Sequence, residues 1–193
     1  PVTTPSAQLT DTERAIGTPS DLPYRVALHR VHRLGSVRFA LLERSYPDLS
    51  DAWRAPLGDL LTAGLDRRTA EAMVLARDEI DPHTEIERLL RAGVRALARI
   101  DPAYPSLLRE IDDAPPVIYV RGTFTHEDDW SVAVVGTRRA TVYGRQATAE
   151  LARGLASGGI TVVSGLARGV DTIAHRTALD TGGRTLAVLA NGL

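Results

Sequence analysis

Two short glycine-containing turns carry the residues whose types and spacing suggest chemistry. Each turn follows an apolar run, at residues 132–135 and 160–163, that we expect to be a buried strand, and each precedes a helical pattern. Gly136 and Gly165 lie about one βαβ unit apart, so parallel strands would bring both turns to the same edge of a sheet. Backbone N–H groups at helix starts attract anions, and arginine side chains match phosphate oxygens. The spacing therefore predicts a phosphate site.

The two turns supply the candidate binding residues. In each turn a glycine permits close backbone approach, while hydroxyl groups and arginines supply polarity and charge. The alternative is tight packing of strand on helix without any ligand. Tyr143 has two possible roles, as a core aromatic at a helix start or as a stacking partner for a base. The candidates are Gly136, Thr137, Arg138, Arg139, Tyr143, Ser164, Gly165, Ala167, Arg168 and Gly169.

Two further polar residues follow the second turn. Asp171 and His175 are four residues apart and share one face of the expected helix. We expect Asp171 to accept backbone N–H groups at the helix start rather than to act as a general base. We expect His175 to make a structural hydrogen bond.

Several catalytic and cofactor signatures are absent from the sequence. Around Gly136 there is no G-x-G-x-x-G, and no Walker sequence can occur because the chain has no lysine. There is also no G-x-S-x-G elbow, no H-E-x-x-H and no acidic metal cluster beside the turns. We therefore expect neither an enzyme nor a cofactor or metal.

Charge is distributed unevenly along the chain. The net charge of the 193 residues is −1, and all 23 basic residues are arginines. Residues 1–129 hold 16 arginines and 21 acids, whereas residues 130–193 hold 7 arginines and 3 acids. The turns thus lie in the basic part, although uniform use of arginine also fits a GC-rich genome. No cysteine, signal peptide or membrane-length apolar run occurs, so we expect a cytoplasmic protein without membrane contact.

The turns must be positioned by an α/β segment. From residue 130 onward the pattern predicts strands at 132–135, 160–163 and 184–189, separated by helices at 143–157 and 170–181. Paired glycines at 158–159 and 182–183 would end the helices. This βαβαβ series is half of a doubly wound fold, so we expect a parallel Rossmann-like sheet that is incomplete here and truncated at its C-terminal side.

The preceding sequence predicts other elements. We expect a disordered lead-in at 1–20, a small helical domain of four or five helices at 21–80, and the Rossmann-like domain at 81–193. Between the helices, glycine corners at 31–37 and 60–65 are either plain αα corners or helix-hairpin-helix hairpins that hold DNA phosphate.

Residues 82–122 connect the helical domain with the glycine turns. A helix from Pro82 should bury Ile86, Leu89 and Leu90 and end at Gly93. We then expect strands at 94–100 and 117–120, with a short helix at 106–110 between them.

Specific segments resemble a known bacterial family. VAVVGTRRAT at 132–141, VSGLARGVD at 163–171 and GGRTLAVL at 182–189 closely resemble the DNA-processing family DprA, also called Smf. DPAYPSLL at 101–108 and PVIYVRG at 116–122 are similar to the segments that lead into the core of that family. The resemblance covers roughly residues 22–193 and includes a SAM-like or helix-hairpin-helix-like helical domain.

The resemblance implies a function that the residues alone do not. Proteins of this family have an extended Rossmann fold and bind single-stranded DNA. They protect incoming strands in natural transformation and help load RecA. They act as homodimers without an established catalytic activity or cofactor. By this resemblance Arg138 is the best DNA-contacting candidate. The later half of the family, with its dimer and RecA surfaces, is not found up to Leu193, and Ala190 and Asn191 depart from the usual small Gly and Thr.

Two other classes remain open at this point. A nucleotide phosphoribohydrolase would need a P-G-G-x-G-T segment and an acidic catalytic residue, and neither occurs in this sequence. A scaffold would bind protein partners through its helical domain and use the α/β part only to dimerise.

Overall fold

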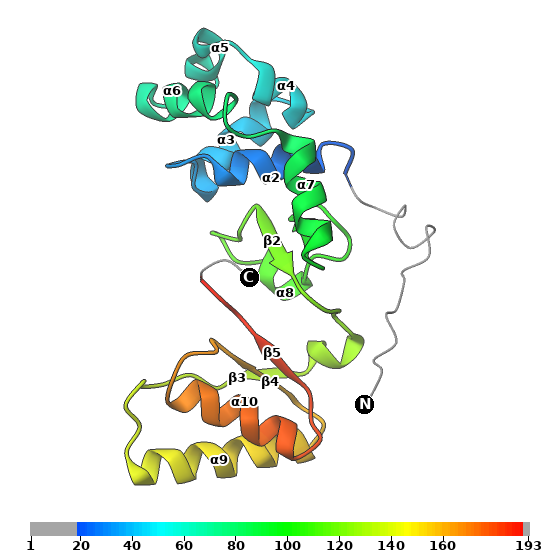
Figure 1. Ribbon diagram of the computed structural model, residues 1–193, viewed down its shortest axis with the longest axis vertical. Helices are drawn as coiled ribbons and strands as arrows, with labels where there is room; N and C mark the ends of the chain where they lie inside the picture. The colour runs from blue at the N-terminus through cyan, green and yellow to red at the C-terminus, as the bar shows by residue number, and fades with distance from the viewer. Residues whose placement is uncertain (1–18, 191–193) are drawn as a thin grey trace. The chain divides into compact units, whose positions relative to one another are not determined.

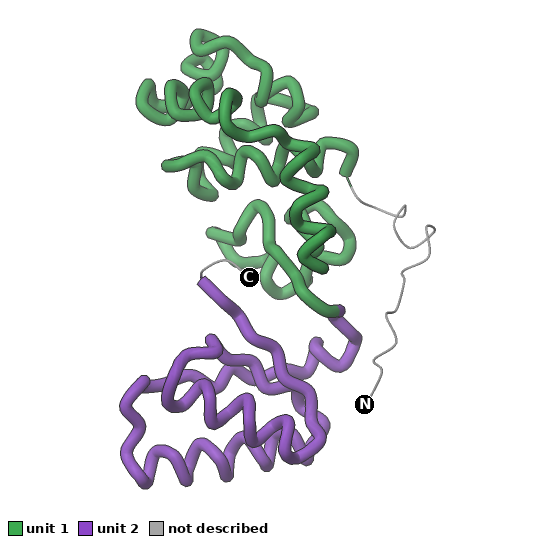
Figure 2. Tube along the Cα trace, in the orientation of Figure 1, with its two compact units in different colours: residues 1–122 green, residues 123–193 purple. Residues whose placement is uncertain are grey.

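The computed structural model describes residues 19–190, which form two compact units divided between Gly122 and Thr123 (Figure 2). Most of the expected lead-in at 1–20 lies outside the described residues, as do the last three residues of the chain. Both units contain helices and strands, but within residues 19–190 only the second unit contains a parallel sheet (Figure 1).

Short helices open unit 1, as their apolar spacing predicted. They are α2 (Leu22–Arg30), α3 (Ser36–Ser45), α4 (Leu49–Arg54), α5 (Leu57–Thr62) and α6 (Arg67–Ala76). Their apolar faces meet in a core that includes Phe39, Leu42, Leu60 and Met73. The prediction of a bundle of short helices is therefore confirmed.

Aspartates set the starts of several of these helices. Asp48 accepts a hydrogen bond from the Ser50 N–H at 2.7 Å, and Asp66 accepts one from the Thr69 N–H at 3.1 Å. These side chains satisfy N–H groups that have no partner within the helix.

Unit 1 continues through a helix and a β-hairpin. After α7 (Pro82–Arg91), strand β1 (Arg95–Ala98) pairs antiparallel with β2 (Val117–Val120), and α8 (Ser106–Arg109) lies in the connection. Gly93 follows α7 with φ +67°, as a helix-ending residue does. The prediction that Leu90 is buried was wrong, because the buried side of α7 carries Pro82 and Glu85 while Leu90 is 62% exposed.

Helix α2 joins the bundle to the hairpin. Its Ala27 and Leu28 belong to the bundle core, whereas Leu22 and Val26 pack with residues of β1 and β2. The compact unit thus extends past residue 80, the boundary between domains that we expected from the sequence.

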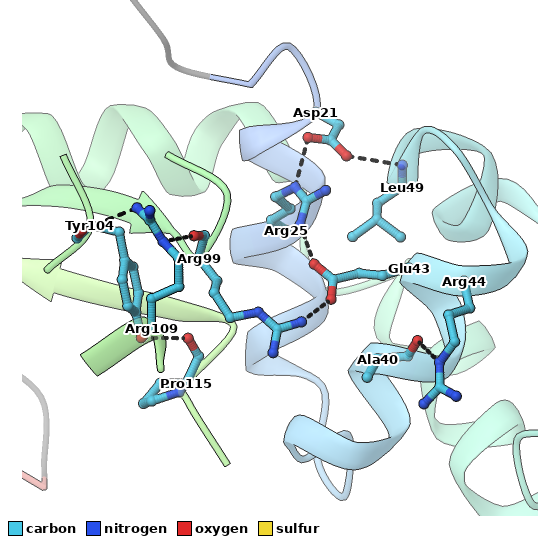
Figure 3. Close-up of polar contacts among 10 residues, drawn as sticks. All are labelled: Asp21, Arg25, Ala40, Glu43, Arg44, Leu49, Arg99, Tyr104, Arg109 and Pro115. Carbon is cyan, nitrogen blue, oxygen red and sulfur yellow. Dashed lines mark hydrogen bonds and ion pairs between the residues drawn. The ribbon is translucent and has the colours of Figure 1, made fainter. Parts of the chain in front are cut away.

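A buried charge network reinforces this junction (Figure 3). Arg25, which is 5% exposed, donates to Asp21 at 2.8 Å and to Glu43 at 2.6 Å. Glu43 also accepts a hydrogen bond at 2.8 Å from Arg99, which follows β1. Burial opposes the charge of Arg25, but these carboxylates raise its pKa on balance. Asp21 further accepts the Leu49 N–H at 3.1 Å, so one network ties α2, α3 and α4 to the hairpin.

Unit 2 holds the predicted βαβαβ series. After the short 3-10 helix η1 (His126–Asp129) come β3 (Ser131–Ala133), α9 (Val142–Ser157), β4 (Thr161–Ser164), α10 (Val170–Asp180) and β5 (Thr185–Ala187). Within residues 123–190 the strands form one parallel sheet of order β3-β4-β5, with Val132 opposite Val162 and Val163 opposite Leu186.

Both helices of unit 2 lie on the same side of the sheet (Figure 1). Ala152 and Ala156 of α9 pack with Ala174 and Ala178 of α10 and with Val162 of β4. Small side chains allow the helices and the strand to approach closely. Gly159 and Gly182, with φ values of +74° and +77°, end the two helices as predicted.

The two strands before the turns differ in burial. We expected a buried strand in both places, and β4 is indeed buried at Thr161, Val162 and Ser164. The prediction was wrong for β3, whose three residues are all exposed. Strand β3 is an edge strand of the described sheet, so it has a strand neighbour on one side only.

Candidate functional site

The two glycine turns lie against each other at the carboxyl ends of β3 and β4. The Val170 N–H donates a hydrogen bond to the Thr137 carbonyl oxygen at 3.2 Å, which joins the second turn to the first. Gly169 has φ +89°, and a Cβ atom there would overlap the backbone of Thr137 and Arg138. Only glycine fits at this position. The contact between the two turns confirms the prediction that they meet at one edge of the sheet.

The other two glycines make room for protein side chains. A Cβ atom on Gly136 would lie 2.8 Å from Val170 Cγ2, and one on Gly165 would lie 2.9 Å from Asp171 Oδ2. Tight packing, the alternative considered from the sequence, therefore accounts for both positions.

Arginines surround a hollow beside the joined turns. Its lining residues are Arg138, Arg139, Ala167 and Arg168, and its volume is about 510 Å³. All three arginines are exposed, and among residues 19–190 no carboxylate forms an ion pair with them. The hollow is thus cationic, with donors free to bind an anion.

Some predicted site residues serve the turns rather than the hollow. Ser164 is buried and donates its hydroxyl to the Val134 carbonyl oxygen at 2.6 Å. The Thr137 hydroxyl accepts the Arg139 N–H at 3.1 Å, which fixes the bend before the arginines. These contacts shape the backbone that presents the cationic groups.

Tyr143 lies outside the core. It is the second residue of α9 and is 81% exposed, which excludes the core aromatic, one of the two roles left open from the sequence. The start of α9 is instead capped by Thr141, whose hydroxyl accepts the Gly144 N–H at 3.0 Å. The phenol ring is left open to solvent.

Asp171 and His175 have the structural roles that their spacing predicted. Asp171 is buried in the first turn of α10, where its Oδ2 accepts the Ala167 N–H at 3.4 Å. His175 Nδ1 lies 2.7 Å from the Thr185 hydroxyl on β5. Burial lowers the pKa of His175, although Asp171 acts in the opposite direction. The ring therefore favours its neutral form and acts as a link between α10 and β5.

Leu166 is not among the site residues predicted from the sequence, but its backbone conformation is unusual. This residue has φ +57° and is 56% exposed at the tip of the second turn. The available signal was a large apolar residue between Gly165 and Ala167, where a turn usually carries small or polar residues.

A second hollow of unit 2 has the opposite charge. It measures about 540 Å³ and lies before β3 and β4, and its lining includes Glu127, Asp129 and the 77% exposed Trp130. Carboxylates at its wall do not suit a phosphate. Of these two hollows, the one beside the glycine turns is therefore the one whose lining suits an anion.

The glycine corners of unit 1 differ in the start of the helix that follows. At the second corner Asp66 caps α6, and its Oδ2 also accepts a hydrogen bond from Arg38 at 2.8 Å. A carboxylate thus occupies the place of a phosphate, which argues for the plain αα corner. At the first corner α3 begins after Gly35 without a side-chain cap.

The described residues contain neither a candidate metal site nor a membrane-spanning helix. Across residues 19–190 no group of three or more His, Asp or Glu residues could hold a metal ion. No helix in the same part of the chain is both long and apolar enough to cross a membrane.

The fold and the turns together define a Rossmann-like α/β protein with exposed arginines at one edge of its parallel sheet. Residues 95–193, slightly more than half of the chain, match the family described as DNA recombination-mediator protein A. The chain belongs to this family, and the resemblance predicted from its turns is confirmed.

Individual relatives agree with this assignment. Protein Smf of Synechocystis sp. is 34% identical over 179 residues, which are 90% of this chain and 45% of that protein. DNA processing protein DprA of Streptococcus pneumoniae is 40% identical over 94 residues, covering 49% of this chain and 33% of that protein. The chain thus spans less than half the length of these relatives.

A solved structure supports the fold. The crystal structure of DprA from Streptococcus pneumoniae superposes with a TM-score of 0.65 and 27% identity, covering 88% of this chain and 58% of that one. The α/β, Rossmann-like class with a helical N-terminal region is therefore confirmed.

Proposed function

We propose that the joined glycine turns form part of a binding surface for single-stranded DNA. The observation that carries this proposal is the hollow lined by Arg138, Arg139 and Arg168, three exposed arginines without a carboxylate partner in the described residues. The family is described as a DNA recombination mediator, and DNA is a polyanion that a cationic hollow can bind.

The proposed mechanism uses the backbone of the strand. Arginine forks hold successive phosphates, while the bases point outward or stack on exposed side chains such as Tyr143. Phosphates are the same at every nucleotide, so the surface should show little sequence preference.

The wider role follows from the family resemblance. We propose a cytoplasmic protein that protects incoming single strands during natural transformation and recombination and helps load RecA onto them. In the full-length protein it would act as a homodimer, and it would bind DNA rather than catalyse a reaction.

The decisive experiment measures affinity for a labelled oligothymidylate at several salt concentrations. Log affinity should fall against log salt with a slope of about −0.7 for each phosphate neutralised. Arg138→Ala should weaken binding, whereas Arg153→Ala, which removes the same charge from an exposed position on α9, should change it little. An affinity that does not depend on salt would contradict the proposal.

Nucleoside monophosphate serves as the competing ligand in the same titration. Preference for the monophosphate, with turnover, would support the phosphoribohydrolase instead. Binding of neither ligand would favour the scaffold.

A further inference from the structure

The backbone conformation of Leu166 is energetically unfavourable for a leucine. Its φ of +57° falls in the left-handed region, which large non-glycine residues rarely occupy. Its side chain is also 56% exposed, so the apolar surface is not hidden inside unit 2. The unfavourable backbone and the exposed apolar side chain thus belong to one residue at the tip of the second turn.

Hydrogen bonds on the C-terminal side of the turn fix this conformation. The Ala167 N–H is bound by Asp171, and the Ala167 carbonyl oxygen accepts both the N–H and the hydroxyl of Thr172, at 3.1 and 2.7 Å. On the N-terminal side, Gly165 is packed against Asp171. The neighbours of Leu166 thus impose the left-handed backbone whatever side chain it carries.

Local structure does not explain why leucine occupies this position. Glycine adopts the left-handed region freely and asparagine tolerates it, and neither would expose a large apolar group. A strained, exposed residue at a binding loop points to a contact that forms when the ligand arrives.

The surroundings indicate which part of the ligand Leu166 meets. The next two residues, Ala167 and Arg168, line the cationic hollow. Phosphates held there leave the bases to project away from the charged groups, toward apolar surfaces at its rim. We infer that Leu166 is a base-contacting residue, whose side chain packs against the face of a nucleobase. This inference rests on the proposed function of the hollow.

The test separates base contact from phosphate contact. Full-chain wild type and Leu166→Asn are titrated with oligothymidylate and with an abasic oligonucleotide of the same length, which keeps the phosphates but lacks the bases. Wild type should prefer oligothymidylate, and Leu166→Asn should lose roughly fivefold affinity for it while binding the abasic strand as wild type does.

Stability and matched variants exclude a structural cause. Because asparagine tolerates the left-handed backbone, the melting temperature of Leu166→Asn should equal or exceed that of wild type. Leu166→Met should retain most of the preference for bases, and Leu179→Gln, which removes another exposed leucine of unit 2, should leave both affinities unchanged.

Each outcome decides the inference. If Leu166→Asn binds both strands as wild type does, the base contact is refuted while the phosphate site stands. An equal loss for both strands would also refute it, since the effect would not involve bases. If wild type binds neither strand, the proposed function fails and the inference fails with it.

Discussion

Arginine serves different purposes in the two units. In unit 1, Arg25 and Arg99 are bound by carboxylates, and both donate to Glu43. Beside the turns of unit 2, Arg138, Arg139 and Arg168 are exposed and form no ion pair with any described carboxylate. The comparison shows that the neighbouring acid, rather than the arginine itself, decides whether the charge supports the fold or remains available to a ligand.

The acids explain how this difference arises. Helices α2 and α3 place Asp21 and Glu43 on either side of Arg25 (Figure 3). At the turns, by contrast, Asp171 is committed to the Ala167 N–H inside the bend. The nearest acid of the second turn is thereby used by the backbone, and Arg168 keeps its charge free.

Breaking the network of unit 1 should have the largest effect on stability. Glu43→Ala leaves Arg99 without its carboxylate and removes one of the two that hold Arg25. Loss of one partner from a buried pair costs about 3–5 kcal/mol of unfolding free energy. Urea unfolding followed by the fluorescence of the buried Trp53, in a Trp130→Phe background, measures this loss.

An exposed pair provides the control for that experiment. Glu71 is bound to Arg67 at 3.2 Å on the surface of α6, so Glu71→Ala should cost less than about 1 kcal/mol. Equal losses from Glu43→Ala and Glu71→Ala would show that the buried network does not stabilise unit 1.

The joined turns of unit 2 should be the next most sensitive feature. Gly169→Ala places a Cβ at φ +89° and against the backbone of Thr137 and Arg138, so it should cost about 2 kcal/mol or more. Thermal unfolding of unit 2 and affinity for oligothymidylate should both fall. Gly154→Ala is the matched control, because it lies in α9 with no atom within 4 Å and should stabilise the helix slightly.

Acid should weaken unit 1 through its capping carboxylates. The hydroxyl and N–H of Thr69, together with Arg38, lower the pKa of Asp66 from 3.8 to about 2. Because the folded pKa lies below the unfolded one, the stabilisation is complete above about pH 4 and is lost as the pH falls toward 2. Asp66→Asn should flatten this part of a plot of melting temperature against pH, and an unchanged slope would exclude Asp66 as the cause.

The smallest effect on stability is expected at the cationic hollow. Arg168→Ala should change the unfolding free energy by less than about 0.5 kcal/mol, because the side chain is exposed and unpaired among the described residues. It should nevertheless reduce the salt slope of DNA binding by about 0.7 if Arg168 neutralises one phosphate. A large loss of stability would mean that the contrast between the two sets of arginines does not hold.

Much of the fold could be predicted because its signals are local. Apolar spacing predicted the short helices of unit 1 and the alternating strands and helices of unit 2. Glycines at helix ends, such as Gly93 and Gly159, indicated where helices stop, since the left-handed backbone favours glycine. Parallel strands on either side of a helix then required the two turns to meet.

The predictions of burial that were wrong depended on contacts distant in sequence rather than on local signals. Leu90 fits the apolar pattern of its helix, yet it is 62% exposed, and of the two roles left open for Tyr143 its exposure excludes the core aromatic. Strand β3 has the composition of a buried strand but lies at the edge of the described sheet. Burial depends on which distant segments cover a residue, and a local pattern does not contain that information.

The sequence by itself therefore determined the order of the elements, the meeting of the turns and the basic character of the segment that contains them. Tertiary structure decided which acid reaches which arginine, because Glu43, the carboxylate shared by Arg25 and Arg99, lies on α3 and is distant in sequence from both. It also decided that Val170 and Asp171 fill the space beside Gly136 and Gly165. Finally, it placed Leu166 in the left-handed region beside Ala167, whose N–H and carbonyl oxygen are bound by Asp171 and Thr172 of α10.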